Sequence, residues 1–299
     1  MLKQDWNGVI PAITTPFNQD LTVDVVAMES HVSWLMESGC RGVVALGSLG
    51  EASTLGFDEK IEVLKACKKG LQERGPLVAG IAAISTADAV NLAIAAYEAG
   101  CDGLMVLPPY VYQSDWRETE AHMGAVIAAT PLSCLLYNNP IAYGTDISPA
   151  QTRLFADKYS NLHAVKESSS DVRRLMAIRE LVGDRLALLV GVDDLIVESI
   201  AGGACGWIAG LVNAFPVESV RLFDLAVAGR FEEARTLYEW FLPLLRMDTV
   251  SKFVQLIKLV QAEVGKGSAR VRPPRLELEG AEREEALNII RTHLARRNV

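Results

Sequence analysis

Residues 132–169 read LSCLLYNNPIAYGTDISPAQTRLFADKYSNLHAVKESS, and this stretch decides the fold class. Its two short apolar runs, Leu132–Tyr137 and His163–Lys166, have the length of buried β-strands. The longer, more polar segment after Ser148 separates them and is predicted to form a helix. A strand, a helix and another strand in this order indicate parallel strands joined by a right-handed crossover.

The same alternation continues in both directions and gives eight strand–helix units. Strands are predicted at Gly8–Thr14, Arg41–Leu46, Leu77–Ile81, Gly103–Leu107, Leu132–Tyr137, His163–Lys166, Leu186–Val190 and Gly206–Ala209. Helices are predicted at Val25–Ser38, Asp58–Glu73, Ala87–Ala99, Trp116–Ala129, the stretch after Ser148, Asp171–Leu181, Leu195–Ala201 and Val217–Ala228. Eight such units close a (β/α)8 TIM barrel, an α/β fold, in a chain of 299 residues. A doubly wound open sheet is the main alternative, but the GxGxxG turn that usually marks it is absent.

Three helical segments without intervening strands follow the eighth unit, at Phe231–Met247, Val250–Glu263 and Ala281–Arg297. The stretch Gly265–Glu279 contains two prolines and breaks the helical pattern. No low-complexity linker precedes these segments. We therefore expect residues 1–228 to form the barrel and residues 229–299 to form a C-terminal helical extension packed on it.

The composition is that of a globular protein and argues against several kinds of partner. Half of the residues are hydrophobic and 22% are charged, which allows a sizeable core. No apolar run approaches the roughly 18 residues that span a bilayer, so no membrane partner is expected. The formal charge of −8 argues against nucleic acid, because phosphate binding needs concentrated positive charge. The N-terminal residues lack a secretory signal pattern, so we expect a cytoplasmic protein.

Cysteine and histidine usage gives no sign of a metal site. The five cysteines are scattered singly, at Cys40, Cys67, Cys101, Cys134 and Cys205. Their odd count argues against a complete disulfide framework, and no CxxC pair has zinc spacing. We interpret them as small buried side chains in a reducing compartment. A metal-dependent barrel lyase would need clustered ligands at strand ends, and the four histidines do not provide them.

Candidate catalytic residues are sought where the predicted strands end, because barrel enzymes carry their active sites at that face. Polar or glycine-containing sequences follow five of the strands, at Gly47–Glu51, Leu107–Tyr110, Tyr137–Pro140, Lys166–Ser169 and Gly191–Asp194. Asp193 and Asp194 could contact distal hydroxyls of a substrate, or they could cap a helix.

Lys166 is the last residue of an apolar strand, so its amine is expected in largely apolar surroundings. Burial disfavours the charged form and lowers the pKa of a lysine, which is the condition for a nucleophilic amine at neutral pH. The alternative is a lysine paired with Glu167 or an exposed charge at the end of the barrel.

Two further features lie at the same predicted face of the barrel, where the strands end, and could take part in the same reaction. Tyr137 ends the neighbouring strand, and its phenol can transfer protons at a reacting carbon, although a buried tyrosine bonded to backbone is the commoner arrangement. The turn Gly47–Glu51 can expose backbone N–H groups as an anion cradle, with the Ser48 hydroxyl beside them.

Together these pieces resemble the dihydrodipicolinate synthase / N-acetylneuraminate lyase superfamily. The resemblance runs through the whole barrel into the helical tail. It is carried by the opening Gly8–Phe17, the turn Gly47–Glu51, Tyr137–Pro140 and Lys166–Ser169.

The resemblance implies a role for several positions of this sequence. Lys166 matches the Schiff-base lysine, and Tyr137 matches the tyrosine that relays protons at the reacting carbon. Ser48 matches the hydroxyl that links this tyrosine to solvent. Tyr110 matches a tyrosine inserted into the neighbouring subunit's site, which implies a homodimer or the homotetramer usual in the family. We expect substrate contacts at the remaining matched positions, namely Gly47, Leu49, Asn139, Gly191 and the backbone carbonyl of Ile208.

The sequence also departs from the family pattern. Leu49 stands where a second hydroxyl residue often binds the substrate carboxylate, so Ser48 and backbone N–H groups would have to bind it. Ala142 stands where the synthases of lysine biosynthesis place an arginine for the second substrate. Loss of that guanidinium disfavours the synthase reaction. The sequence after Lys166 also differs from the Lys-Phe-Thr type of the sialic acid lyases.

The tail, with 248–258 and Arg272-Pro273-Pro274-Arg275, looks most like catabolic members, so we expect a lyase that acts on a small 2-oxo acid or a cyclic imine without a cofactor. The favoured reaction is that of 1-pyrroline-4-hydroxy-2-carboxylate deaminase in hydroxyproline breakdown. The alternatives are a 2-keto-3-deoxy sugar acid dehydratase or aldolase, then 4-hydroxy-tetrahydrodipicolinate synthase or N-acetylneuraminate lyase. A non-catalytic binding protein is disfavoured, because it would be expected to lose the lysine or the tyrosine.

Overall fold

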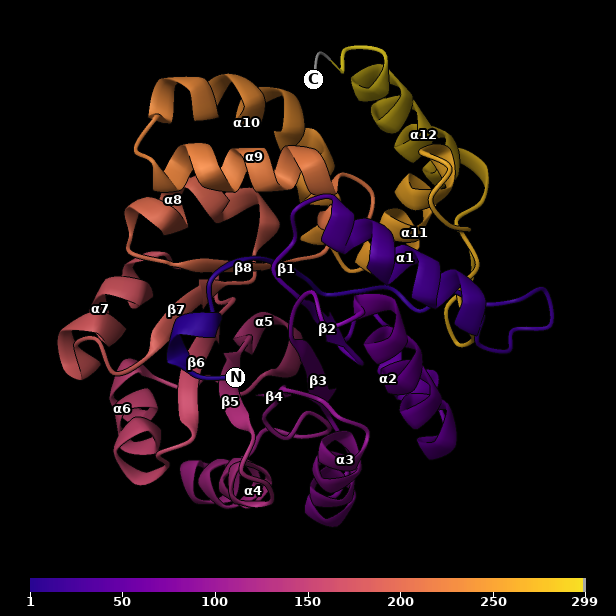
Figure 1. The fold of residues 1–299 in the computed structure, drawn as a ribbon. Coiled ribbons are helices and arrows are strands. Elements are labelled where there is room, and N and C mark those ends of the chain that lie inside the picture. The colour runs from indigo at the N-terminus through magenta and orange to yellow at the C-terminus, as the bar shows by residue number, and fades with distance from the viewer. Residues whose placement is uncertain (298–299) are drawn as a thin grey trace.

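The computed structural model describes residues 1–297 and shows one eight-stranded parallel sheet. The strands follow one another in the order β1-β8-β7-β6-β5-β4-β3-β2. A bridge between Ala12 and Val44 joins the two ends, where the N–H of Ile13 donates to the carbonyl of Val44 at 2.9 Å. The sheet is thus a barrel surrounded by helices (Figure 1), and the predicted (β/α)8 fold is confirmed.

The strands are β1 (Gly8–Pro11), β2 (Val43–Ala45), β3 (Leu77–Ile81), β4 (Gly103–Val106), β5 (Ser133–Asn138), β6 (Leu162–Glu167), β7 (Ala187–Val190) and β8 (Gly206–Ala209). The helices are α1 (Val25–Glu37), α2 (Phe57–Leu71), α3 (Thr86–Glu98), α4 (Trp116–Ala128), α5 (Pro140–Tyr143), α6 (Pro149–Lys158), α7 (Arg173–Val182), α8 (Ile196–Ala201), α9 (Pro216–Val227), α10 (Phe231–Leu245), α11 (Phe253–Glu263) and α12 (Gly280–Leu294). Each predicted strand and helix is present, with ends that differ by up to three residues.

The short helix α5 was not predicted, because four residues show no periodicity. Its ends are fixed locally instead. The Asn139 side chain accepts from the N–H of Ala142 at 3.0 Å, and Pro140 occupies the first helical position. Gly144 ends the helix with a φ of 72°, a conformation that glycine adopts without steric cost. The chain therefore turns back over the barrel immediately after β5.

Strand periodicity divides the buried side chains between two cores. Side chains of alternate strand residues fill the barrel interior, including Leu135 and Tyr137 of β5 and Ala164 of β6. The other set, such as Leu136 and Val165, packs outward against the helices. Lys166 lies two residues after Ala164, so the same alternation directs its side chain into the barrel.

The N-terminal residues close the end of the barrel opposite to the strand C-termini. The side chain of Trp6 is fully buried in the interior cluster, and its indole N–H donates to the Ser133 hydroxyl at 2.8 Å. In Figure 1 the N-terminus accordingly lies in the middle of the ring of helices. This arrangement leaves the other end of the barrel as the mouth.

The helices α10, α11 and α12 follow the barrel and lie together on one side of it (Figure 1). Trp240 of α10 donates to the carbonyl of His293 in α12 at 3.0 Å. Lys258 of α11 forms a buried ion pair with Glu51, in the loop after β2, at 2.5 Å. The C-terminal helices are therefore attached to one another and to the mouth of the barrel.

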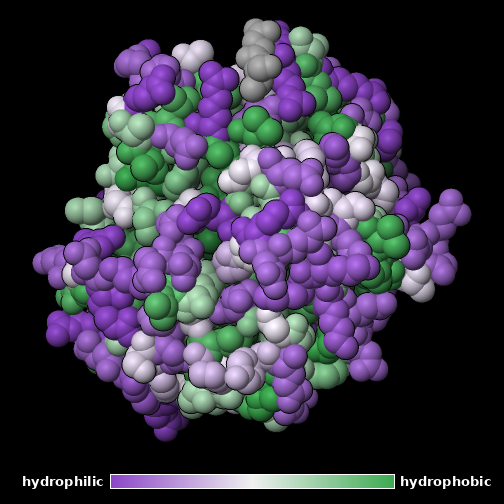
Figure 2. Space-filling view, in the orientation of Figure 1, coloured by the Kyte–Doolittle hydropathy of each residue, from purple (hydrophilic) through white to green (hydrophobic). Residues whose placement is uncertain are grey.

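The surface mixes polar and apolar residues, as Figure 2 shows for the face seen in Figure 1. Within residues 1–297, every helix is too short or too polar to span a lipid bilayer. All five cysteines are free thiols, and all but the half-buried Cys205 are buried. Burial raises the pKa of the Cys134 thiol to about 12, so it stays protonated at neutral pH.

Candidate active site

Lys166 and Tyr137 lie side by side at the mouth of the barrel. They are register partners on the adjacent strands β6 and β5, and both are at the C-terminal ends of their strands. The Nζ atom of Lys166 lies over the Tyr137 ring, 4.2 Å from its centroid. Both side chains are buried, with exposed fractions of 5% and 7%. The phenol and the amine therefore face the same small space.

Burial lowers the pKa of Lys166, while Tyr143 and the carboxyl groups of Asp248 and Asp193 act in the opposite direction. Gly191, directly after β7, makes room for the lysine. A Cβ atom at this position would lie 2.0 Å from Cε of Lys166 and 2.3 Å from the Ser168 hydroxyl. Only glycine fits there without displacing the amine.

The alternative in which Lys166 pairs with Glu167 or is exposed is wrong. The Glu167 side chain points to the other face of β6 and accepts from Arg174 at 3.1 Å. It also accepts from the Asn138 side chain at 3.2 Å and from the N–H of Ser169 at 2.7 Å. Glu167 thus fixes the ends of β5 and β6 from outside the barrel and leaves the amine without a carboxylate partner on its own strand.

The turn at 47–51 is bounded by two residues with positive φ, Leu46 at 61° and Glu51 at 54°. The Glu51 carboxylate is fully buried and accepts from Lys258 and from the N–H of Arg272 at 2.9 Å. Within residues 1–297, the N–H groups of Ser48 and Leu49 donate to no protein acceptor. The turn therefore offers backbone donors at the mouth, held in an unusual conformation by buried contacts.

Ser48 and Asn139 each bond a tyrosine hydroxyl. The Ser48 hydroxyl shares a hydrogen bond with the hydroxyl of Tyr143, the last residue of α5. The Asn139 side chain donates to the Tyr137 hydroxyl at 3.1 Å. Burial raises the pKa of Tyr137, and hydrogen bonding by Asn139 and Tyr143 partly offsets this rise. Two phenols and two polar side chains thus surround the space above Lys166.

The remaining expected site residues are placed as follows. The Leu49 side chain is 4% exposed and packs in the core outside the barrel, so the substrate contact expected of this side chain is not formed at the mouth. Gly47 lies next to Met105, and Ile208 fills the barrel interior on β8. Tyr110 follows β4 and lies edge-on to Tyr143, with ring centroids 6.2 Å apart.

Asp193, after β7, does not cap either of the two helices that directly follow this strand. Its fully buried carboxylate accepts from the Trp207 indole at 3.0 Å and from the N–H of Leu211 at 2.8 Å. Asp248, which precedes α11, lies against Gly210, and its buried Oδ1 atom has no hydrogen-bond partner within residues 1–297. Burial raises the pKa of both carboxyl groups.

Three residues of this site were not anticipated, namely Ser168, Tyr143 and Asp248. Ser168 and Tyr143 both lie within motifs of the sequence, but their contacts depend on how the loops fold. Ser168 is 2% exposed, and its hydroxyl has no partner within the described chain. Asp248 lies 82 positions after Lys166 and shows no local pattern, so only the packing of the C-terminal helices reveals it.

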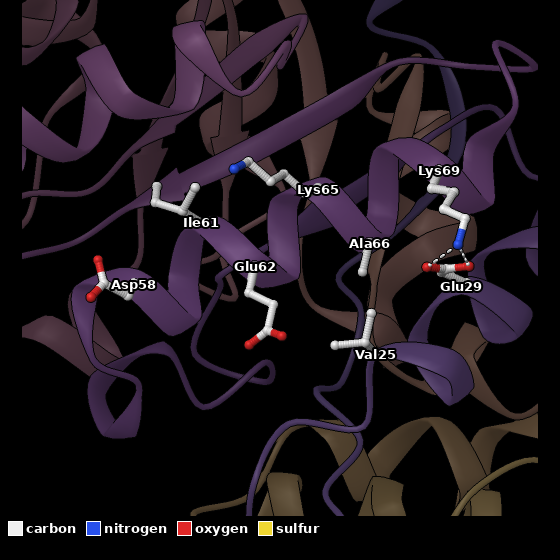
Figure 3. Close-up of a pocket in the computed structure, with 8 residues that line it drawn as sticks. All are labelled: Val25, Glu29, Asp58, Ile61, Glu62, Lys65, Ala66 and Lys69. Atoms are coloured by element: carbon white, nitrogen blue, oxygen red, sulfur yellow. Dashed lines mark hydrogen bonds and ion pairs between the residues drawn. The ribbon is translucent and has the colours of Figure 1, made fainter.

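Away from the mouth, a surface groove of about 420 Å³ lies between α1 and α2 (Figure 3). Charged side chains of both signs line it, and Lys69 pairs there with Glu29 at 2.7 Å. Within residues 1–297, no group of three His, Cys, Asp or Glu side chains could hold a metal ion.

The fold and the mouth define a barrel with a buried lysine beside a phenol at its catalytic face. Residues 5–293 match the model of the dihydrodipicolinate synthetase family, so the chain belongs to this family, whose members are lyases. The 4-hydroxy-tetrahydrodipicolinate synthase of Methanocaldococcus jannaschii is 29% identical, over 96% of this chain and 98% of that protein. The Methanopyrus kandleri enzyme of the same name is 31% identical, over 96% and 95%.

A solved structure has the same fold. The chloride-inhibited dihydrodipicolinate synthase of Acinetobacter baumannii, in complex with pyruvate, superposes with a TM-score of 0.91. It is 29% identical, and the match covers 96% of this chain and 98% of that one. The resemblance inferred from the strand-end motifs is thereby confirmed at the level of the family.

Proposed function

We propose that this protein is a lyase in which Lys166 forms a Schiff base with C2 of a small 2-oxo acid or of the related cyclic imine. The observation that carries the proposal is the buried amine placed over the Tyr137 ring. Burial lowers the pKa of Lys166 and so increases the fraction of neutral, nucleophilic amine. The Acinetobacter baumannii relative was solved with pyruvate, a 2-oxo acid, which supports this substrate class.

The substrate carboxylate would bind at the turn that follows β2. The N–H groups of Ser48 and Leu49 have no protein acceptor in the described chain, and the Ser48 hydroxyl lies beside them. Backbone N–H groups in such a turn form an anion-binding concavity. The Leu49 side chain packs in the core outside the barrel, so this position offers only its backbone N–H group.

For the particular reaction we propose 1-pyrroline-4-hydroxy-2-carboxylate deaminase. Lys166 attacks C2 and displaces the ring nitrogen, which opens the ring to a primary amine at C5. The C2 iminium acidifies the C3 proton, Tyr137 accepts it, and the 4-hydroxyl group leaves as water. Proton shifts then move the C3–C4 double bond to C4–C5, and protonation at C4 turns this enamine into an imine at C5. Hydrolysis at C5 releases ammonia, and hydrolysis at C2 frees Lys166, so one water is consumed net and 2-oxoglutarate semialdehyde is formed.

The synthase reaction in the names of the relatives is the second candidate. Against it, Ala142, an exposed residue of α5, has no charge, where a second substrate with a carboxylate needs an anchor. A 2-keto-3-deoxy sugar acid dehydratase or aldolase would use the same first intermediate. The buried carboxyl group of Asp248 and the free hydroxyl of Ser168 are suited to bind hydroxyl groups of such substrates.

The covalent step has a direct test. Borohydride reduction with pyruvate should add one three-carbon unit to Lys166, detected by peptide mass spectrometry. Lys166→Ala should lose both the label and turnover, while Lys69→Ala, a surface control, should keep both. Turnover that persists in Lys166→Ala would sink the Schiff-base proposal.

A substrate panel separates the reactions that share this intermediate. We expect ammonia release from 1-pyrroline-4-hydroxy-2-carboxylate to exceed every other activity. Pyruvate with aspartate semialdehyde, 2-keto-3-deoxy sugar acids, and pyruvate with aldehydes are assayed beside it. A larger kcat/KM for the aspartate semialdehyde reaction would show that the synthase assignment is correct.

The assembly is also proposed to be a homodimer or homotetramer. Tyr110 and its exposed neighbours Val111 and Tyr112 form an apolar loop after β4, which would reach a neighbouring subunit. Sedimentation at micromolar concentration measures the state directly, and a monomer would contradict it.

A further inference from the structure

Tyr143 ends α5 at a position where its side chain turns back into the mouth. The helix start is fixed by Asn139, and the left-handed Gly144 fixes its end. The ring of Tyr143 packs against the cluster that fills the barrel interior. The short helix α5 thus places a second phenol, that of Tyr143, at the candidate site.

The hydroxyl of Tyr143 has hydrogen-bonding contacts with two other hydroxyl groups, those of Ser48 and Tyr137. It shares a hydrogen bond with the Ser48 hydroxyl on the opposite side of the mouth. Its ring stands edge-on to Tyr137, with centroids 5.7 Å apart and an angle of 79° between the planes. Ser48, Tyr143 and Tyr137 therefore form a continuous row of hydroxyl-bearing side chains that ends over the amine of Lys166.

We propose that Tyr143 is the middle member of a proton relay that is complete within one subunit, running from Tyr137 through Tyr143 to Ser48 and solvent. The inference rests on the proposed Schiff-base function and adds a residue to it. Tyr143 contacts Tyr137 and Ser48, so its proposed role is that of a positioning and proton-transfer residue.

In this relay each hydroxyl group accepts one proton and passes its own proton on to the next group. When the C3–H bond of the iminium breaks, its electron pair forms the C2–C3 double bond, and the nitrogen becomes neutral. The proton moves to the Tyr137 oxygen as the Tyr137 proton passes to Tyr143, the Tyr143 proton to Ser48 and the Ser48 proton to water. Each hydroxyl ends as it began, and no buried phenolate accumulates. Burial raises the pKa of Tyr137 and Tyr143, so a concerted transfer avoids the costly anion.

The relay is distinct from one that needs a tyrosine from a neighbouring subunit. Tyr110 of the same subunit lies edge-on to Tyr143, with ring centroids 6.2 Å apart, and has no hydrogen bond to Ser48 or Tyr137 within residues 1–297.

The test measures exchange of the pyruvate methyl protons in D2O, followed by proton NMR, together with borohydride labelling of Lys166. Tyr143→Phe keeps the ring and removes the hydroxyl. We expect normal labelling but exchange slowed about tenfold or more, since a positioned acid–base group contributes about 10²–10⁴-fold. Tyr97→Phe, at an exposed tyrosine of α3, is the matched control and should exchange at the wild-type rate.

Combining Ser48→Ala with Tyr143→Phe tests independently whether the two residues act in one relay. If Tyr143 and Ser48 act in series, the double variant should exchange no more slowly than the slower single variant. Exchange within twofold of wild type in Tyr143→Phe overturns the relay, and so does a loss of exchange in Tyr110→Phe alone. A wild-type protein without any label at Lys166 would instead overturn the proposed function, and the relay with it.

Discussion

At the scale of single residues, the surroundings of Lys166 determine its chemistry. Burial dominates and lowers its pKa from the ordinary lysine value of 10.5, because the low-dielectric interior disfavours the ammonium form. No carboxylate of its own strand compensates, since Glu167 pairs with Arg174 on the other face. The reactivity proposed for Lys166 thus depends on its burial at the end of the strand and not on an adjacent base.

This predicts the pH dependence of labelling. A lowered pKa means that the neutral amine is present at lower pH than in an exposed lysine. The rate of cyanoborohydride trapping with pyruvate should therefore rise with pH to a plateau. The midpoint of this rise should lie below pH 10.5. A midpoint at or above 10.5 would show that burial does not control the amine.

At the scale of elements, the ends of β5 and β6 are joined to α7 by Arg174. Its guanidinium donates to Glu167 and to Asp146, at 3.1 and 2.9 Å. The Glu167 side chain is 4% exposed, so removal of Arg174 leaves a buried carboxylate without its cation. The ion pair therefore holds the strand ends that carry Tyr137 and Lys166.

Arg174→Ala should lower the free energy of unfolding by about 3 kcal/mol, the usual cost of removing one partner of a buried ion pair. Urea titration followed by circular dichroism measures the change. The neighbouring Arg173→Ala is the control, because Arg173 pairs with Asp171 on the surface and its side chain is 87% exposed. Equal effects of the two substitutions would contradict a special role of Arg174.

At the scale of the whole molecule, the C-terminal helices are coupled to the mouth through Lys258 and Glu51. Both side chains are buried, with exposed fractions of 2% and 0%. Lys258 also donates to the carbonyl of Arg270 at 2.7 Å and lies 4.3 Å from the centre of the Phe17 ring. The pair joins α11 to the turn that carries Ser48, so the tail positions part of the candidate site.

Lys258→Met should lower the free energy of unfolding by about 3 kcal/mol or more, because Glu51 keeps its charge without the cation. The double variant Glu51→Gln with Lys258→Met should regain part of the loss. Lys252→Met is the control, since Lys252 pairs with Glu282 on the surface, where a pair contributes about 0–1 kcal/mol. A double variant less stable than the single one would contradict this account.

The same pair has a pH signature. Burial lowers the pKa of Lys258 to about 8, and Glu51 opposes the shift. Between about pH 8 and 10.5 the unfolded chain therefore binds more protons than the folded chain, and the contribution of this group to stability rises with pH. Lys258→Met should lose this slope.

The sequence by itself determined the fold and the position of the proposed nucleophile. Eight apolar runs alternating with helical segments specify the barrel, because strand and helix periods are local properties of the chain. Parallel pairing places every strand end at one face, so Lys166 and Tyr137 could be expected near each other. The family followed from the motifs at those ends.

Only the tertiary structure decided what surrounds these two residues. Tyr143 reaches Ser48 because α5 turns over the mouth, and Lys258 reaches Glu51 across 207 positions of the chain. A substrate contact was expected at Leu49, but its side chain packs into the core outside the barrel. Contacts of this kind depend on how loops and distant helices share space, and no local period in a sequence encodes that arrangement.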